Sequence, residues 1–208
     1  MPEVKWVFFD IGNVLLFFDH EKALVNLSRL TKVDVTTLRG MFQTDTFFDD
    51  FERGAVDKAK FCAMVRSLNP AAKDAEIVEA ASDIFVVNQP MVKLLDGLKE
   101  SGFSLGLLSN TNEVHVEYMR SHYHFHDTVD VPIYSHEVGA RKPERPIFEA
   151  ALKGAGCSFE ECLYFDDIPE YTAVARSLGL QSITYTYKDH GAFVEELLTK
   201  APKVAACL

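Results

Sequence analysis

The stretch VKWVFFDIGNVLLFF, residues 4–18, places an acidic side chain, Asp10, at the end of an apolar run. The segment 4–9 is apolar apart from Lys5, which predicts a strand that is buried on both faces of a sheet. A carboxylate at the end of such a strand is costly to remove from water unless its charge is paired. The sequence therefore predicts that groups from elsewhere in the chain compensate the charge of Asp10.

Short apolar segments, each followed by a polar turn and a helical pattern, recur along the chain. We expect strands at residues 4–9, 104–108, 133–135, 162–165 and 182–186, and helices at 90–100, 148–152 and 172–178. Alternation of strands and helices is typical of proteins with parallel sheets covered by helices. The sequence predicts an α/β fold whose core is a doubly wound, Rossmann-like parallel sheet.

One long segment interrupts this alternation. Residues 17–83 show amphipathic helical patterns, with apolar clusters at 23–27 and 61–65 and few strand-like runs. We expect a small all-helical cap inserted after the first strand. The predicted domains are a core of residues 1–16 and 84–208 and a helical cap of residues 17–83.

Composition and charge exclude several classes of function. The 208 residues carry a formal net charge of -10, which argues against binding to nucleic acid and means that an anionic substrate must be held by local cations. The N-terminal apolar run is too short to cross a membrane, which takes about 20 apolar residues, and Glu3 does not suit a secretory leader. The four cysteines show no paired C-x-x-C spacing. We expect a cytoplasmic monomer or homodimer without membrane or nucleic-acid partners.

Polar residues stand where several of the predicted strands end. In an open parallel sheet, ligands bind beyond the carboxyl ends of the strands, so these residues are expected to meet in one crevice. They are Asp10, Ser109, Asn110, Lys142, Asp166 and Asp167. Three carboxylates brought together indicate a Mg²⁺ site. A hydroxyl group, a backbone N–H and an ammonium group are suited to holding phosphoryl oxygens.

Four segments carry a family resemblance: FFDIGNV around Asp10, LLSNTN around Ser109, GARKPERPIF around Lys142, and YFDD with Asp166 and Asp167. With these in order, the chain resembles the haloacid dehalogenase superfamily over essentially its whole length, and within it the subfamily called IA. The helical insertion is similar to the small cap of the first cap class. The D-x-G-N-V pattern resembles a bacterial subgroup that includes an α-glucose-1-phosphate phosphatase.

The resemblance implies a Mg²⁺-dependent phosphatase that acts on a small phosphorylated metabolite, a sugar phosphate such as a hexose 1-phosphate or a nucleotide. Asp10 matches the family nucleophile, which forms a phosphoaspartyl intermediate that water then hydrolyses. Ser109 and the backbone N–H of Asn110 match the phosphate-binding groups. Lys142 matches the cation that neutralises the transferring oxygens.

The same resemblance implies the ligands of the metal. Asp10, the backbone carbonyl of Gly12 and Asp167 match groups that bind Mg²⁺ directly. Asp166 is expected in the first coordination sphere or just outside it.

Two positions depart from the common phosphatase pattern. Gly12 stands where relatives carry an aspartate that protonates the leaving group, and loss of such an acid typically costs about 10²–10⁴-fold in rate. The rate is therefore expected to depend strongly on the basicity of the leaving group. Tyr171 stands where relatives with a double aspartate commonly carry asparagine. In the cap, Phe47, Asp49 and Arg53 are candidates for substrate specificity.

Two other functions stay open at this stage. The first is a metal-free 2-haloacid dehalogenase, in which Asp10 attacks carbon, although Asp166 and Asp167 would then lack a neutralising cation. The second is a non-catalytic binding protein on the same fold, which the departures at Gly12 and Tyr171 make conceivable.

Overall fold

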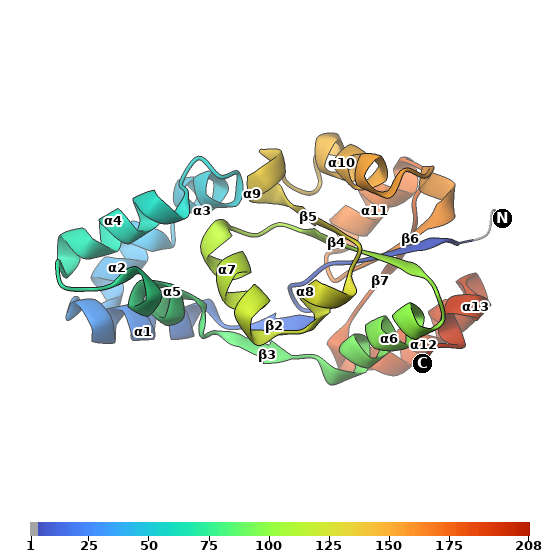
Figure 1. Cartoon of the computed structure of the whole chain (residues 1–208), viewed down its shortest axis with the longest axis horizontal. Helices are drawn as coiled ribbons and strands as arrows, with labels where there is room; N and C mark the ends of the chain where they lie inside the picture. The colour runs from blue at the N-terminus through green and yellow to red at the C-terminus, as the bar shows by residue number, and fades with distance from the viewer. Residues whose placement is uncertain (1–3) are drawn as a thin grey trace.

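The computed structural model describes residues 4–208, and its centre is a five-stranded parallel sheet (Figure 1). The strands are β1 (Trp6–Phe9), β4 (Ser104–Ser109), β5 (Val131–Tyr134), β6 (Cys162–Asp166) and β7 (Gln181–Thr184), in the spatial order β5-β4-β1-β6-β7. The first strand of the chain thus lies in the middle of the sheet. The predicted α/β fold with a parallel core is confirmed.

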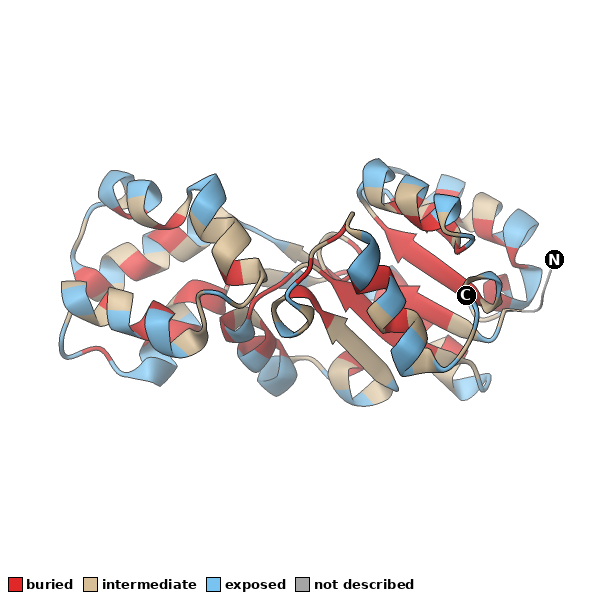
Figure 2. Ribbon diagram, turned by 90° about the horizontal axis from the view of Figure 1, so that it is seen from above, coloured by how far each residue is buried: buried red, intermediate tan, exposed pale blue. Residues whose placement is uncertain are grey.

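Helices cover both faces of the sheet. Most residues of the strands between them are therefore buried, and these are red in Figure 2. Along β1, Val7 and Phe9 pack with α6 (Gln89–Glu100), α12 (His190–Lys200) and α13 (Pro202–Ala205). Phe8, between them in sequence, faces the opposite side, where α10 (Arg145–Ala155) and α11 (Pro169–Ser177) pack. Because successive strand residues point to opposite faces, one apolar run serves two hydrophobic clusters.

Five helices lie together at one end of the molecule, on the left of Figure 1. They are α1 (His20–Thr31), α2 (Val35–Phe42), α3 (Asp45–Glu52), α4 (Lys58–Leu68) and α5 (Asp74–Ser82). Asp19, Asp34, Thr44 and Asp57 accept hydrogen bonds from backbone N–H groups at the starts of the first four helices. The helices share a hydrophobic cluster of their own. We propose that these five helices form the cap. Its boundaries, residues 17–83, stay a prediction.

A two-stranded antiparallel sheet joins this helical part to the core. Strand β2 (Leu16–Phe18) pairs with β3 (Phe85–Val87), with Phe17 opposite Val86. The helical pattern was expected to begin at residue 17, whereas Phe17 and Phe18 are extended. A strand of three residues is too short to show a periodic pattern in the sequence. The pair holds the two ends of the insertion side by side.

The remaining elements lie between strands of the sheet in the sequence, except for η2, which follows β7. They are α7 (Glu113–His122), α8 (Phe125–Thr128), α9 (Ser135–Val138), and the 3₁₀ turns η1 (Phe159–Glu161) and η2 (Tyr187–Asp189). Within residues 4–208, no helix combines the length and the apolar character needed to span a bilayer.

The close packing of β1 against β4 leads to a stability prediction. A methyl group added at Gly106 would overlap with the ring of Phe8, which is 1% exposed. We expect Gly106→Ala to lower the free energy of unfolding by about 1–3 kcal/mol, the usual cost of overpacking a core. Gly40→Ala is the control, because it lies within α2 with no atom within 4 Å of the added group. It should stabilise the protein by about 0.5–1 kcal/mol. Equal melting temperatures of Gly106→Ala and the wild type would contradict this packing.

Candidate active site

The carboxyl ends of two adjacent central strands, β1 and β6, bring charged residues together around one buried lysine. Asp10 follows β1, Asp166 ends β6, and Lys142 comes from the loop between α9 and α10. The Lys142 ammonium lies 2.9 Å from Oδ1 of Asp10 and 2.7 Å from Oδ2 of Asp166. The lysine is 2% exposed, and it also donates a hydrogen bond to the carbonyl of Leu108 at 2.9 Å. Its charge is thus compensated from two neighbouring strands.

Asn110 fixes the backbone that carries this lysine. The N–H of Lys142 donates to Oδ1 of Asn110 at 2.7 Å, and Nδ2 of Asn110 donates to the carbonyl of Lys142 at 3.0 Å. The ring centre of Tyr171 lies 5.4 Å from the ammonium, and its hydroxyl accepts a long hydrogen bond of 3.5 Å from Asn110. Tyr171, which departs from the asparagine of the common pattern, therefore contributes an aromatic contact to the lysine.

The two consecutive aspartates have different surroundings. Both oxygens of Asp166 are engaged: Oδ2 accepts from Lys142 and the hydroxyl of Tyr164, and Oδ1 accepts from the N–H of Ile168 at 2.8 Å. Asp167 is half-buried and accepts one side-chain hydrogen bond, from Asn13 at 3.0 Å. Asn13 has a φ of 53°, a left-handed conformation that asparagine adopts more readily than most residues. Asp167 therefore has more capacity left for a ligand than Asp166.

The arrangement of carboxylates fits a divalent cation. Oxygen atoms of Asp10, Asp166 and Asp167 lie within 4.8 Å of one another. When ionised, these three carboxylates carry three negative charges, and Lys142 carries one positive charge. One divalent ion would neutralise the two negative charges that remain. Oδ1 of Asp10 is buried and, within residues 4–208, accepts no hydrogen bond of good geometry. Such hard oxygen ligands suit Mg²⁺.

Burial shapes the ionisation of these groups. Burial, reinforced by Asp166 and Asp167 and opposed by Lys142, raises the pKa of the Asp10 carboxyl to about 7. Burial by itself would lower the pKa of Lys142, but the adjacent carboxylates Asp10 and Asp166 outweigh it and hold that pKa above its usual value. The lysine is therefore charged, and a second cation would favour the ionised form of Asp10 further.

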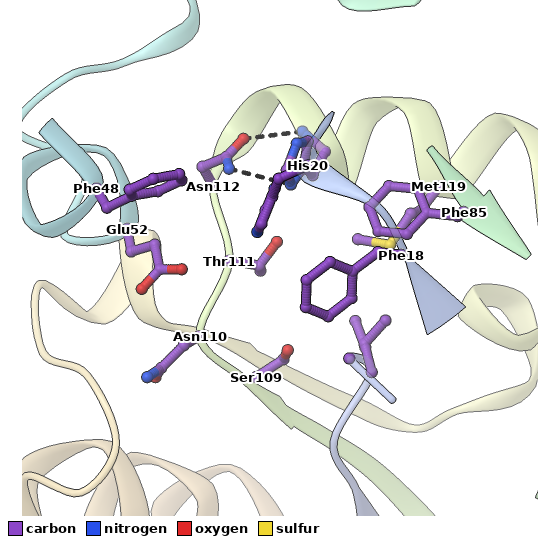
Figure 3. Close-up of a pocket in the computed structure, with 13 residues that line it drawn as sticks. Phe18, His20, Phe48, Glu52, Phe85, Ser109, Asn110, Thr111, Asn112 and Met119 are labelled. Atoms are coloured by element: carbon purple, nitrogen blue, oxygen red, sulfur yellow. Dashed lines mark hydrogen bonds between the residues drawn. The ribbon is translucent and has the colours of Figure 1, made fainter. Parts of the chain in front are cut away.

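Two connected hollows open from these residues. The carboxylate cleft is lined by Asp10, Asn13, Glu52, Arg141, Lys142 and Asp167, among others. The inner cavity, drawn in Figure 3, lies between the core and the helical insertion and is lined by Phe18, Phe48, Glu52, Ser109, Thr111 and His115, among others. Ser109 is 2% exposed and belongs to the inner cavity. The site thus pairs a highly charged cleft with a more apolar chamber.

Hydrogen bonds order the loop between β4 and α7 on the core side of the inner cavity. The N–H of Thr111 donates to the hydroxyl of Ser135 at 2.9 Å, and that hydroxyl donates back to the carbonyl of Thr111 at 3.0 Å. Asn112 caps the start of α7 by accepting from the N–H of His115 at 3.0 Å. The loop that carries Ser109 and Asn110 is therefore held on both sides.

The three specificity candidates of the cap do not line either hollow. Phe47 packs within the helical cluster, with ring-centre distances of 5.5 Å to Phe42 and 5.3 Å to Phe51. Asp49 lies 2.9 Å from Nη1 of Arg141, and Arg53 donates to Glu144 at 3.0 Å. Asp49 and Arg53 thus join the cap to the core.

The other face of α3 supplies the residues that the sequence analysis missed. Phe48 and Glu52 are four residues apart, so they share one side of the helix, and both line the inner cavity. The sequence does show that Phe48 and Glu52 share one face of a helix, because they are four residues apart. It does not show that this face of α3 is the one that meets the core.

Gly12 lies at the junction of the two hollows. A Cβ atom at this position would lie 3.0 Å from Cε1 of Phe18 and 3.8 Å from Oδ2 of Asp10. The ring of Phe18 therefore occupies the space that a larger residue at position 12 would need.

Comparison with known proteins assigns the family. The family model of haloacid dehalogenase-like hydrolases matches residues 4–179, and the chain belongs to this family. A phosphatase of Mycobacterium tuberculosis is 27% identical, with 86% of each chain covered. A D-ribitol-5-phosphate phosphatase of Bacteroides thetaiotaomicron is 25% identical, over 86% of this chain and 90% of the relative. A haloacid dehalogenase family enzyme from Bacteroides thetaiotaomicron, solved with magnesium and inorganic phosphate, superposes with a TM-score of 0.75 at 27% identity, covering 88% of this chain and 94% of that structure.

The carboxylate cluster leads to a binding prediction. Mg²⁺ should raise the melting temperature, because a ligand bound only by the native state stabilises it by about 2.7 kcal/mol at a hundred times its dissociation constant. Asp167→Asn should remove most of this shift. Asp96→Asn is a control, because Asp96 lies on α6 and pairs with His124, away from the cluster. A wild-type Mg²⁺ shift in Asp167→Asn would exclude Asp167 from the metal site.

Proposed function

We propose that the protein is a Mg²⁺-dependent phosphatase that hydrolyses a small phosphorylated metabolite through a phosphoaspartyl intermediate. The observation that carries this proposal is the Asp10 carboxylate, held 2.9 Å from a buried lysine at the end of the central strand and open to the carboxylate cleft. Phosphatases among the relatives, and the solved relative that holds magnesium and phosphate, support it.

The residues of the cleft divide the work of phosphoryl transfer. Asp10 attacks phosphorus, and the bond from phosphorus to the leaving oxygen breaks. Lys142 keeps Asp10 ionised and pairs with oxygens of the transferring group. The Ser109 hydroxyl and the N–H of Asn110 bind the phosphoryl group. Water then attacks phosphorus, releases inorganic phosphate and restores the Asp10 carboxylate.

We assign the metal to Asp10, the carbonyl of Gly12 and Asp167. Asp166 is placed beside these ligands, because its oxygens already accept hydrogen bonds from Lys142, Tyr164 and Ile168, and its role is to orient the lysine. When bound, Mg²⁺ supplies positive charge that stabilises negative charge on the phosphoryl oxygens.

For the substrate class, we propose a sugar phosphate such as a hexose 1-phosphate, with a nucleotide as the alternative. The relative that acts on D-ribitol-5-phosphate and the resemblance to the D-x-G-N-V subgroup support this choice. The inner cavity offers aromatic rings for the apolar face of a sugar and polar groups, among them Asn112, for its hydroxyls.

The two alternative functions fit the site less well. In a metal-free 2-haloacid dehalogenase, Asp10, Asp166 and Asp167 would meet with Lys142 as the cation of the cluster, and the excess negative charge would raise the cost of ionising the nucleophile. A non-catalytic binding protein would not need a buried nucleophile and lysine in contact.

Asp10→Asn tests the proposed mechanism. The amide has nearly the same shape but is a poor nucleophile, so phosphate release should fall by on the order of 10⁴-fold or more. The melting temperature should stay the same or rise without metal, because one of several crowded carboxylates is gone. Phosphate release from an aryl phosphate would be measured with Mg²⁺ and with excess chelator, after mass spectrometry has excluded deamidation.

The same assay separates the alternatives. We expect phosphate release with Mg²⁺, none in chelator, and no chloride release from 2-chloropropionate. Full activity in chelator, or turnover by Asp10→Asn, would overturn the mechanism. Chloride release with an inert phosphate ester would favour the dehalogenase.

A further inference from the structure

Glu52 stands at the boundary between the carboxylate cleft and the inner cavity. Four residues line both hollows: Gly12, Phe18, Glu52 and Asn110. Glu52 alone among these four has an ionisable side chain, and its side chain is 20% exposed. In Figure 3 it lies on the cap side of the cavity, with Ser109, Asn110 and Thr111 on the core side. A phosphoryl group held between Asp10 of the cleft and Ser109 of the inner cavity spans this boundary, and the oxygen that joins it to the organic group then lies close to the boundary.

The end of α3 that carries Glu52 is fixed to the core. Gly54 has a φ of 75°, and a Cβ atom there would overlap with the carbonyl oxygen of His136 on α9. This close approach and the positive φ both favour glycine. Arg53 donates to Glu144 at 3.0 Å, and Arg141 pairs with Asp49 at 2.9 Å. Contacts on both sides of Glu52 thus hold the carboxyl group over the site.

The charged and titratable groups that face Glu52 come from three parts of the chain. The charged groups are Asp49 on its own helix and Arg141 and Lys142 in the loop before α10, and the neutral but titratable phenol of Tyr171 faces it from α11. Oε2 of Glu52 lies 2.7 Å from Nε of Arg141, but within residues 4–208 this oxygen accepts no hydrogen bond of good geometry. Burial raises the pKa of Glu52 despite the opposing effect of Arg141 and Lys142. Burial thus favours the protonated form of Glu52, and the two cations favour its ionised form.

The other polar groups of the inner cavity are poorer proton donors. Burial lowers the pKa of His20 and of His115, so both imidazoles are neutral at pH 7 and weak acids. The hydroxyls of Ser109 and Thr111 are weaker acids than a carboxyl group. Glu52 is the side chain best suited to proton transfer at the boundary.

We propose that Glu52 is the general acid and base of the phosphatase, supplied by the cap in place of the aspartate that Gly12 lacks. The inference rests on the proposed phosphatase function. In the first step, Asp10 bonds to phosphorus, the electron pair of the broken bond goes to the leaving oxygen, and that oxygen takes the proton of Glu52. In the second step, the Glu52 carboxylate takes a proton from the water that attacks phosphorus, and the electron pair of the bond to Asp10 returns to Asp10. With Glu52 as the acid, the rate depends weakly on the basicity of the leaving group, in contrast to the strong dependence expected from Gly12 alone.

The test is a series of aryl phosphates of similar shape and graded phenol pKa, together with a primary alkyl phosphate. Single-turnover rates of the wild type should depend weakly on leaving-group pKa. Glu52→Gln should lose about 10²–10⁴-fold with the alkyl phosphate and the least acidic phenols, the usual contribution of a general acid. With the most acidic phenol it should lose less than about tenfold, since a good leaving group needs little protonation.

Asp49→Asn is the matched control, because Asp49 shares the helix and the contact with Arg141 but lines neither hollow. Any loss in this variant should be equal across the series, as expected for a positioning effect. Glu52→Gln should also keep the wild-type Mg²⁺ shift in melting temperature, since Glu52 is outside the metal cluster. A loss in Glu52→Gln that is equal for all leaving groups would overturn the proposal.

The wild type provides a second measurement if Glu52→Gln does not fold. The rate with the alkyl phosphate should fall as pH rises through the pKa of the acid, and the rate with the most acidic phenol should not show this decrease. A steep leaving-group dependence in the wild type would overturn the role of Glu52 while leaving the phosphatase intact. Absence of Mg²⁺-dependent phosphate release from every ester would instead refute the proposed function.

Discussion

The ammonium of Lys142, buried between Asp10 and Asp166, is the interaction on which the rest of the site depends. Without this lysine, Asp10 and Asp166 would be buried carboxylates with no adjacent ammonium group, and breaking a buried ion pair in this way commonly costs about 3–5 kcal/mol. The protein surrounds this lysine with fixed groups from four segments, including the backbone carbonyl of Leu108 and the amide of Asn110. The strand order then matters, since only adjacent strands bring Asp10 and Asp166 to one side chain.

Arg141 and Lys142 are consecutive in sequence but serve opposite sides of the site. Lys142 contacts the carboxylates of the core, and Arg141 contacts Asp49 and Glu52 of the helical insertion. One dipeptide therefore links the position of Asp10 to the position of α3. The hydrogen bonds between Asn110 and the backbone of Lys142 hold this dipeptide in place. The same loop thus compensates the charge of Asp10 in the core and binds the helical insertion.

The fold was largely predictable from sequence because parallel strands are marked by apolar runs. Residues at the ends of those runs, such as Asp10 and Asp166, could be brought together from topology alone. The β2–β3 pair and the orientation of α3 were not predictable in this way. The strand at Phe17 has three residues, which are too few for a periodic signal. In α3, Phe47 and Phe48 lie on different sides of the helix, and the sequence alone does not show which of the two rings faces the core. Tertiary packing made that choice.

The proposed proton donor, Glu52, comes from a different part of the fold than the proposed nucleophile, Asp10. An aspartate at position 12 would belong to the same loop as the nucleophile, and it would be present whether or not the helical insertion was docked. The ring of Phe18 fills that space, and the carboxyl group comes instead from α3, whose end rests on Gly54 and on ion pairs across the interface. Acid and nucleophile then belong to different parts of the fold. On this proposal, hydrolysis of an ester with a basic leaving group requires the two parts to be together.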